Sequence, residues 1–150
     1  MNQSESAYLD LPGVAVVKWD PGLRSVFVEL QGWANDLEVE AILDTGLRAL
    51  TEHHGSRWLA DGRNMKVVRQ ADQEWIIENW MPRALAAGLR RNAVVTAKSG
   101  LAMRNLEDML AKVPSDRLEV GYFPTVDLAA AWLIRPPSAR PVVGVSKSQP

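Results

Sequence analysis

Four polar residues in the middle of the sequence have side chains that suit the binding of an anion. Directly after the apolar run "RWLA", residues 57–60, come Asp61, Arg63, Asn64 and Lys66. Arg63 and Lys66 can hold an anion, and Asp61 offers an acceptor or a base. We therefore predict a ligand-binding site at these four residues, the polar cluster. The alternative is that Asp61 and Asn64 hydrogen-bond to their own loop while the cations face water.

Few other residues could support catalysis or metal binding. The sequence has no cysteine, and its two histidines, His53 and His54, are adjacent on a predicted helix. Neighbouring helical side chains diverge by about 100°, so the pair cannot chelate one metal ion. There is no Gly-x-Ser-x-Gly motif and no glycine-rich phosphate loop. We predict no cofactor and no metal site, and a non-enzymatic role is favoured; a small hydrolase or isomerase with Asp61 as base and Arg63 as anion clamp is the enzymatic alternative.

Tryptophan is unusually frequent in this chain. The six tryptophans are Trp19, Trp33, Trp58, Trp75, Trp80 and Trp132. Most are expected in the core, because each ring buries a large area. Trp33, Trp75 and Trp80 are candidates for an apolar pocket or an oligomer interface. They motivate a second functional hypothesis, a carrier of an apolar ligand or lipid, and the prediction of a homodimer.

The composition is that of one globular domain with unevenly distributed charge. The chain has 150 residues, of which 47% are hydrophobic and 23% charged, with a net charge of −1. Residues 1–54 carry 3 basic and 9 acidic side chains, whereas residues 55–105 carry 9 basic and 4 acidic ones. The middle segment favours a basic face or pocket, unless folding interleaves the segments. The overall charge argues against a nucleic-acid partner.

The ends and the apolar runs bear on localisation. The start, "MNQSESAYLD", has neither the basic residues nor the apolar stretch of a signal peptide. No apolar run reaches the roughly 18 residues of a membrane span. The absence of cysteine is compatible with a reducing compartment. We expect a cytoplasmic protein without a membrane span.

The N-terminal part predicts a β-hairpin. The runs "VAVVKW" and "RSVFVEL" are rich in β-branched residues and are separated by "DPGL". Pro21 and Gly22 predict a type II turn, in which Gly22 adopts a positive φ. The preceding "YLDL" predicts a short additional strand.

Strands and helices alternate in the rest of the chain. We expect helices over residues 35–55, 70–88, 100–113 and 126–134, and strands over residues 57–60, 92–97 and 118–123. Pro82 should kink or split the second helix, while Ser99 and Thr125 should cap the last two. The pattern predicts an α/β fold, with a single mixed, largely parallel sheet, an N-terminal antiparallel hairpin and four helices. Residues 1–135 form the predicted domain, and residues 136–150 a flexible C-terminal tail.

A family resemblance is carried by the segments "RWLADGRNMK", "DQEWIIENWMPRALAAG" and "AAAWL" and covers roughly residues 8–134. The resemblance is to the STAS-like domains, typified by bacterial anti-sigma-factor antagonists and by cytoplasmic domains of sulphate transporters. It implies one mixed sheet with packed helices and a regulatory module that binds a partner protein. The antagonists are switched by phosphorylation of a serine that follows an aspartate. Asp61 matches that aspartate, but residues 62–64 carry no hydroxyl, so this switch is not implied here.

The resemblance and the residues together favour one function. The leading hypothesis is a non-enzymatic regulatory module of STAS type that binds a partner protein or a small anion at the polar cluster. The same broad fold resembles the lipid-binding domains of longer lipid-transfer proteins, which keeps the apolar-ligand carrier as the alternative. Parallel α/β sheets bind ligands beyond the carboxyl ends of their strands, where the polar cluster is expected.

Overall fold

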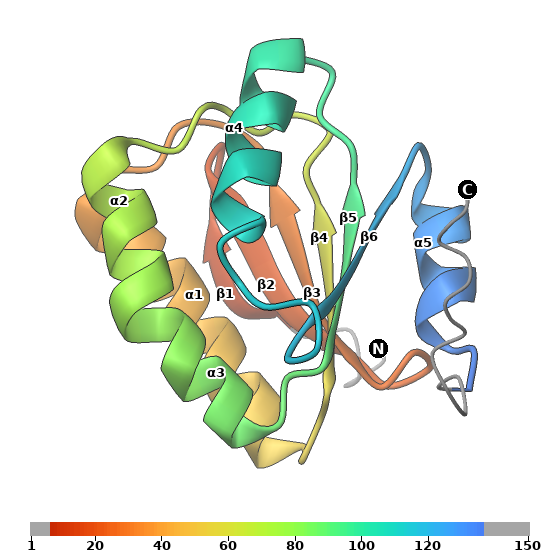
Figure 1. Cartoon of the computed structure of the whole chain (residues 1–150). Helices are drawn as coiled ribbons and strands as arrows, with labels where there is room; N and C mark the ends of the chain where they lie inside the picture. Colours follow the sequence, from red (N-terminus) through yellow and green to blue (C-terminus); the bar gives the residue numbers. More distant parts are fainter. Residues whose placement is uncertain (1–6, 137–150) are drawn as a thin grey trace.

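A single six-stranded sheet lies between two unequal layers of helices in the computed structural model, which describes residues 7–136 (Figure 1). The strands are β1 (Ala7–Leu11), β2 (Ala15–Asp20), β3 (Ser25–Leu30), β4 (Arg57–Asp61), β5 (Arg91–Val95) and β6 (Glu119–Phe123). They lie side by side in sequence order. The pairings β1–β2 and β2–β3 are antiparallel, and β3 to β6 are parallel. The predicted α/β fold class is confirmed.

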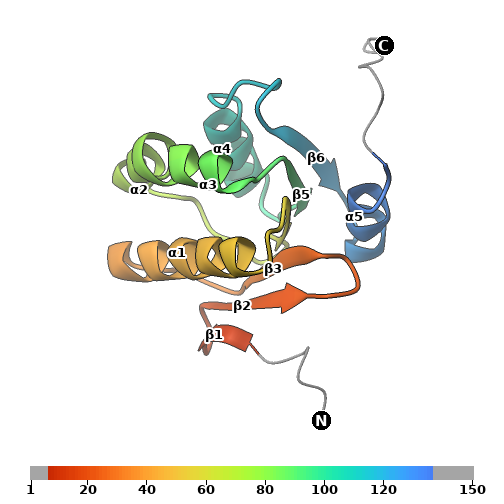
Figure 2. The same cartoon turned by 90° about the horizontal axis from the view of Figure 1, so that it is seen from below.

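The helices are divided between the two faces of the sheet. They are α1 (Asp36–Glu52), α2 (Gln70–Trp75), the π-helical turn η2 (Ile76–Trp80), α3 (Met81–Ala87), α4 (Gly100–Leu110) and α5 (Val126–Leu133). Helices α1 to α4 cover one face and α5 covers the other (Figure 2). Because each parallel strand pairs with the next one in sequence, crossovers of one hand put α1 to α4 on the same face.

The hairpin differs from its prediction in the turn. The two strands pair as expected, with Asp20 opposite Ser25. The positive φ falls on Arg24, at 50°, and not on Gly22, so the predicted type II turn is wrong. The Asp20 carboxylate accepts a hydrogen bond from the backbone N–H of Leu23 at 3.0 Å. This hydrogen bond stabilises a four-residue loop, residues 21–24, in which Arg24 adopts the left-handed conformation just before β3.

Pro82 divides the second helical segment, as predicted. It lies in the first turn of α3, and η2 stands immediately before it. A proline ring would clash with the carbonyl one turn earlier in a regular helix. The helix avoids the clash by widening into the π-helical turn η2, in which the Met81 N–H donates to the Ile76 carbonyl, five residues back. The segment from Gln70 to Ala87 is therefore continuous but not uniformly α-helical.

Each face of the sheet has its own apolar core. Because side chains alternate along a strand, Trp58 and Ala60 of β4 face α1 to α4, while Leu59 faces α5. The core under α5 is small and consists of fully buried Leu59, Ala93, Val95, Ala129 and Leu133. The core under α1 to α4 is much larger and contains Trp58 and Trp80.

A buried arginine holds α5 against the sheet. Arg91, 8% exposed, lies at the start of β5. Its guanidinium donates to the backbone carbonyls of Trp132 at 3.2 Å, Leu133 at 3.1 Å and Arg135 at 2.7 Å. The last turn of a helix leaves such carbonyls without partners inside the helix. Arg91 thus caps α5 and fixes its position.

The sequence also predicted a flexible C-terminal tail and the absence of a membrane span. The predicted C-terminal tail lies, after Pro136, outside the described residues. Over residues 7–136, none of the helices combines the length and the apolar character that crossing a membrane requires.

Candidate functional site: an apolar cavity under the large helical layer

An apolar cavity of about 160 Å³ lies between the sheet and helices α1 to α4. Its walls come from every element of that layer: Val28, Ala60 and Val94 of the strands, Ile42 and Leu43 of α1, Ile76, Trp80 and Met81 of the η2–α3 segment, and Leu106, Met109 and Leu110 of α4. The cavity thus lies within the larger of the two cores.

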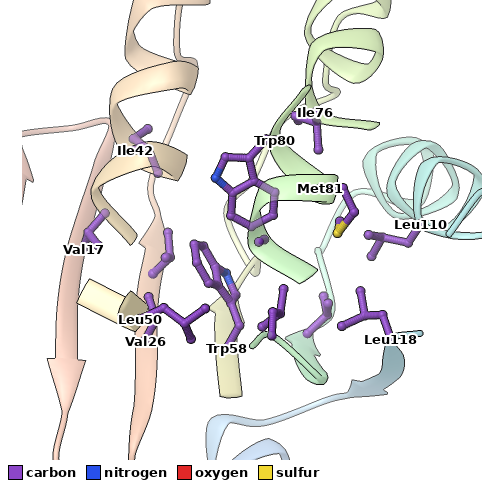
Figure 3. Packing of buried hydrophobic residues seen from close by; sticks show 14 of the residues in the cluster. Val17, Val26, Ile42, Leu50, Trp58, Ile76, Trp80, Met81, Leu110 and Leu118 are labelled. Carbon is purple, nitrogen blue, oxygen red and sulfur yellow. The ribbon is translucent and has the colours of Figure 1, made fainter. Parts of the chain in front are cut away.

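Two tryptophan rings form the centre of the wall. Trp58 and Trp80 meet edge to face, with ring centroids 5.1 Å apart and planes at 76°. Figure 3 shows the two rings between Ile42 on one side and Met81 and Leu110 on the other. Edge-to-face packing is a preferred arrangement for aromatic rings and holds both of them in place.

Neighbouring helices fix the orientation of each ring. The Trp80 Nε1–H donates to the Leu43 carbonyl of α1 at 2.9 Å. Gly46, one turn further along α1, faces the six-membered ring of Trp58, where a Cβ atom would collide with ring carbons. The glycine therefore lets α1 approach the Trp58 ring. The π-helical turn η2 ends at Trp80, and such turns occur frequently at functional sites.

One polar side chain lines the cavity without a hydrogen-bond partner. Among buried side-chain oxygen and nitrogen atoms of residues 7–136, only Asn92 Oδ1 has no partner. Asn92 lies on β5 and pairs in register with Trp58 of β4. Leaving a buried acceptor unsatisfied costs roughly 1–3 kcal/mol. Asn92 therefore places a buried acceptor without a hydrogen-bond partner in a wall that is mostly apolar.

The cavity opens at the carboxyl edge of the strands. Its exposed lining residues, Trp33 (62% exposed), Lys66 and Arg69, follow β3 and β4 in the sequence. Arg69 ties the two sides of this opening together. Its Nη2 bonds the Asp36 carboxylate at 2.6 Å, and its Nε bonds the Asp72 carboxylate at 3.2 Å. The mouth is therefore braced between the start of α1 and the start of α2.

Within the polar cluster, Asp61 and Arg63 form a close ion pair. Arg63 Nε donates to Asp61 Oδ1 at 2.9 Å, and Arg63 Nη2 donates to Oδ2 at 2.7 Å. The Arg63 backbone N–H reaches the same carboxylate at 3.3 Å. Asp61 is 5% exposed, and the hydrogen bonds from Arg63 hold the pKa of Asp61 below its usual value. The carboxylate braces the turn and stays ionised, which suits a structural group better than a catalytic base.

The sheet separates this ion pair from the cavity. Asp61 lies two residues after Leu59 on β4 and so shares the face covered by α5. Lys66 lines the cavity mouth, and the Asn64 side chain is exposed. The structure brings Asp61 and Arg63 together and places Lys66 apart from them, at the mouth of the cavity. Ala60 and Asp61 point to opposite faces of the sheet because side chains alternate along β4. The order of the residues after β4 did not reveal that Asp61 and Lys66 would be separated.

The three tryptophans named as candidates for a pocket or an interface lie in different places. Trp33 stands at the mouth and Trp80 in the wall, while Trp75 does not line the cavity. Trp75 is half-buried, and the Arg83 guanidinium lies over its ring at 5.9 Å. The homodimer stays a prediction. Sequence reasoning missed Trp58 and Asn92, although strand alternation would have put Trp58 and Ala60 on one face.

The chain was compared with family models, with curated proteins and with solved structures, and no match was found in any of the three. The resemblance to STAS-like domains therefore stays a prediction. In the part of the chain that the structure describes, no group of three or more His, Cys, Asp or Glu residues could hold a metal ion.

Proposed function

We propose that the protein is a binding module that holds a small apolar molecule in the cavity under α1 to α4. The single observation that carries this proposal is the cavity itself, walled by Trp58, Trp80 and aliphatic side chains and open beside Trp33. Ligand sites are typically concave, mostly apolar and provided with a few polar groups. The cavity has each of these properties, with Asn92 as the inner polar group.

The position of the mouth supports the same proposal. Ligands of parallel α/β sheets bind beyond the carboxyl ends of the strands. The exposed residues Trp33 and Lys66 lie at this edge and give access from solvent. The pairing of Asp61 with Arg63, in contrast, supports bracing of the turn. It leaves the hydrolase or isomerase hypothesis without a free base at that position.

A small anion or an acidic partner protein at the mouth is the second candidate function. The observation in its favour is that Lys66 and Asn64 are exposed at the carboxyl edge, close in sequence to the cavity lining. Arg63 contributes less than expected, because Asp61 occupies two of its guanidinium nitrogens. Under this second candidate, the protein would be the STAS-type regulatory module that the sequence predicted, with its partner bound at the mouth.

A thermal-shift screen tests the leading proposal. The compounds are single-ring and short-chain apolar molecules, a long-chain fatty acid, and phosphate. The variant Ala60→Leu adds three carbon atoms to a residue that lines the cavity. The matched control, Ala41→Leu, adds the same atoms to an exposed position of α1 that does not line it.

We expect small apolar compounds to raise the melting temperature of the wild type and of Ala41→Leu, and not that of Ala60→Leu. Tryptophan fluorescence should change in parallel, since Trp58 and Trp80 line the cavity. Stabilisation by phosphate alone would favour the second candidate. A wild type that responds to no apolar compound would contradict the leading proposal.

A further inference from the structure

Asn92 lies at the end of the cavity opposite the mouth. It is the second residue of β5, whereas the exposed residues Trp33 and Lys66 follow the carboxyl ends of β3 and β4. A strand rises about 3.3 Å per residue, so the three steps from Asn92 to Val95 span roughly 10 Å. The Asn92 residue is half-buried and its Oδ1 atom is buried, so a ligand that contacts Oδ1 lies toward the amino end of β5, away from the mouth.

The side chains around Asn92 do not satisfy it. Leu89 and Val94, the lining residues nearest to it in sequence, are apolar and almost fully buried. A trapped water at this position would need about 2–4 polar partners, and the side chains of Leu89 and Val94 provide none. A hydrogen-bond donor on a ligand would satisfy the Oδ1 acceptor while the rest of the ligand contacts apolar side chains.

The volume of the cavity limits the size of the ligand. It measures about 160 Å³. An apolar cavity of roughly 150 Å³ accommodates benzene, whereas pockets for drug-sized ligands span roughly 300–1,000 Å³. The cavity therefore matches a single aromatic ring or a group of similar size, and it is too small for a long acyl chain.

The charges around the cavity limit the chemistry of the ligand. The charged lining residues are Lys66, Arg69 and Asp72, and Arg69 and Asp72 pair with each other at the mouth. At the Asn92 end, the wall carries an amide and no charge. An anionic head group buried there would lose its hydration without gaining a counter-ion, at a large cost in free energy.

We propose that the ligand is a neutral molecule of about one ring, with a hydroxyl or N–H group that donates to Asn92 Oδ1. This inference rests on the proposed function and adds the ligand class and the residue that selects it. Asn92 acts as the specificity-determining residue, and the walls around Trp58 and Trp80 bind the ring.

The test compares three probes that share one ring and differ in their polar group. Toluene has none, phenol has a neutral donor, and benzoate is an anion at pH 7. Dissociation constants are measured by calorimetry for the wild type and for Asn92→Leu, which keeps a similar volume and removes the amide. Asn92→Val, which suits a strand, serves if the leucine variant does not fold.

We expect the preference for phenol over toluene to fall by at least about tenfold in the variant, because one donor–acceptor contact is lost and toluene gains an apolar wall. Benzoate should bind neither protein in the cavity and should not compete with phenol.

Two results separate the inference from the proposed function. An unchanged phenol-to-toluene preference, or competition by benzoate, overturns the neutral ligand class while cavity binding stands. Failure of toluene and phenol to bind the wild type overturns the proposed function and this inference together. If neither variant folds, ¹⁵N spectra of the wild type decide: an Asn92 side-chain amide that moves no further with phenol than with toluene overturns the contact.

Discussion

The two faces of the sheet are built differently, although they share the same strands. Under α5, Leu59, Ala93 and Leu133 are fully buried and pack closely, and Arg91 fastens the end of the helix. Under α1 to α4, large side chains surround a cavity that opens to solvent. The difference separates a face that stabilises the fold from a face that has room for a ligand.

Side-chain size explains the difference in packing. Small residues such as Ala93 and Ala129 let α5 lie close to the sheet, so that few gaps remain. On the other face, the rings of Trp58 and Trp80 span the distance between the sheet and the helices. Rigid rings that meet edge to face do not collapse readily into the space beside them, and this preserves the cavity.

The largest expected effect is on the closely packed face. Leu133→Ala should lower the free energy of unfolding by about 2–5 kcal/mol, because it removes buried carbon atoms and leaves a hole. Leu128→Ala, on the same helix but 52% exposed, is the control and should change it by less than about 0.5 kcal/mol. Urea unfolding measures both. Equal losses would mean that α5 does not pack as described.

A matched pair of substitutions compares the two faces directly. Ala93→Leu adds atoms to the closely packed core and should cost about 1–3 kcal/mol through overpacking. Ala60→Leu, on the neighbouring strand, extends into the cavity and should cost nothing or stabilise the protein. Denaturant midpoints of the two variants test this. A similar loss in both would show that the cavity cannot accept the added atoms.

The ion pair on the α5 face should make stability depend on pH. Asp61→Asn should lower the free energy of unfolding at pH 7 by about 1–2 kcal/mol, through weakened hydrogen bonds to Arg63. Because the pKa of Asp61 is lowered in the folded protein, its stabilisation is complete above the ordinary value of about 3.9. It is lost as the pH falls through the lower folded-state pKa.

Unfolding curves at several pH values measure this contribution. The difference between wild type and variant should be constant near neutrality and should shrink below about pH 4. The control is Asp108→Asn, which removes the charge of an exposed carboxylate on α4. A difference that grows on acidification would contradict the ion pair.

The smallest effect is expected at the cavity mouth. Lys66→Ala should change the free energy of unfolding by less than about 0.5 kcal/mol, because the side chain is exposed. It should weaken the binding of neutral ring compounds less than Ala60→Leu does, because Lys66 lines only the mouth, and it should reduce any stabilisation by phosphate. Arg63→Ala, on the other side of the sheet, should destabilise the protein without changing the phosphate response. If Arg63→Ala abolished the phosphate response and Lys66→Ala did not, the anion site would lie at Arg63 and not at the cavity mouth.

Local patterns in the sequence predicted much of the fold. The hairpin, the alternation of strands and helices, the split at Pro82 and the caps at Ser99 and Thr125 are all confirmed. Each depends on residues within a few positions of one another. The turn was the exception, because the Asp20 side chain, and not Gly22, determined its geometry.

The candidate site was predictable only in part. Of the three tryptophans named for an apolar pocket or an interface, Trp33 and Trp80 line the cavity, and Lys66 lies at its mouth. Ligand binding by these residues stays a prediction. Asp61 and Arg63 were assigned to the same site, but strand alternation turns Asp61 to the opposite face. Asn92 drew no attention, since an asparagine in a strand has no meaning until its hydrogen-bond partners are known.

The sequence by itself thus determined the elements and their order, because periodicity, capping and proline geometry act over one or two helical turns. Only the tertiary structure decided which side chains meet across the sheet. The cavity depends on the gap left between strands and helices that lie far apart in the chain. The Asn92 Oδ1 acceptor lacks a partner because no element within residues 7–136 brings a donor to it. Such gaps and missing partners are properties of packing, and no local pattern encodes them.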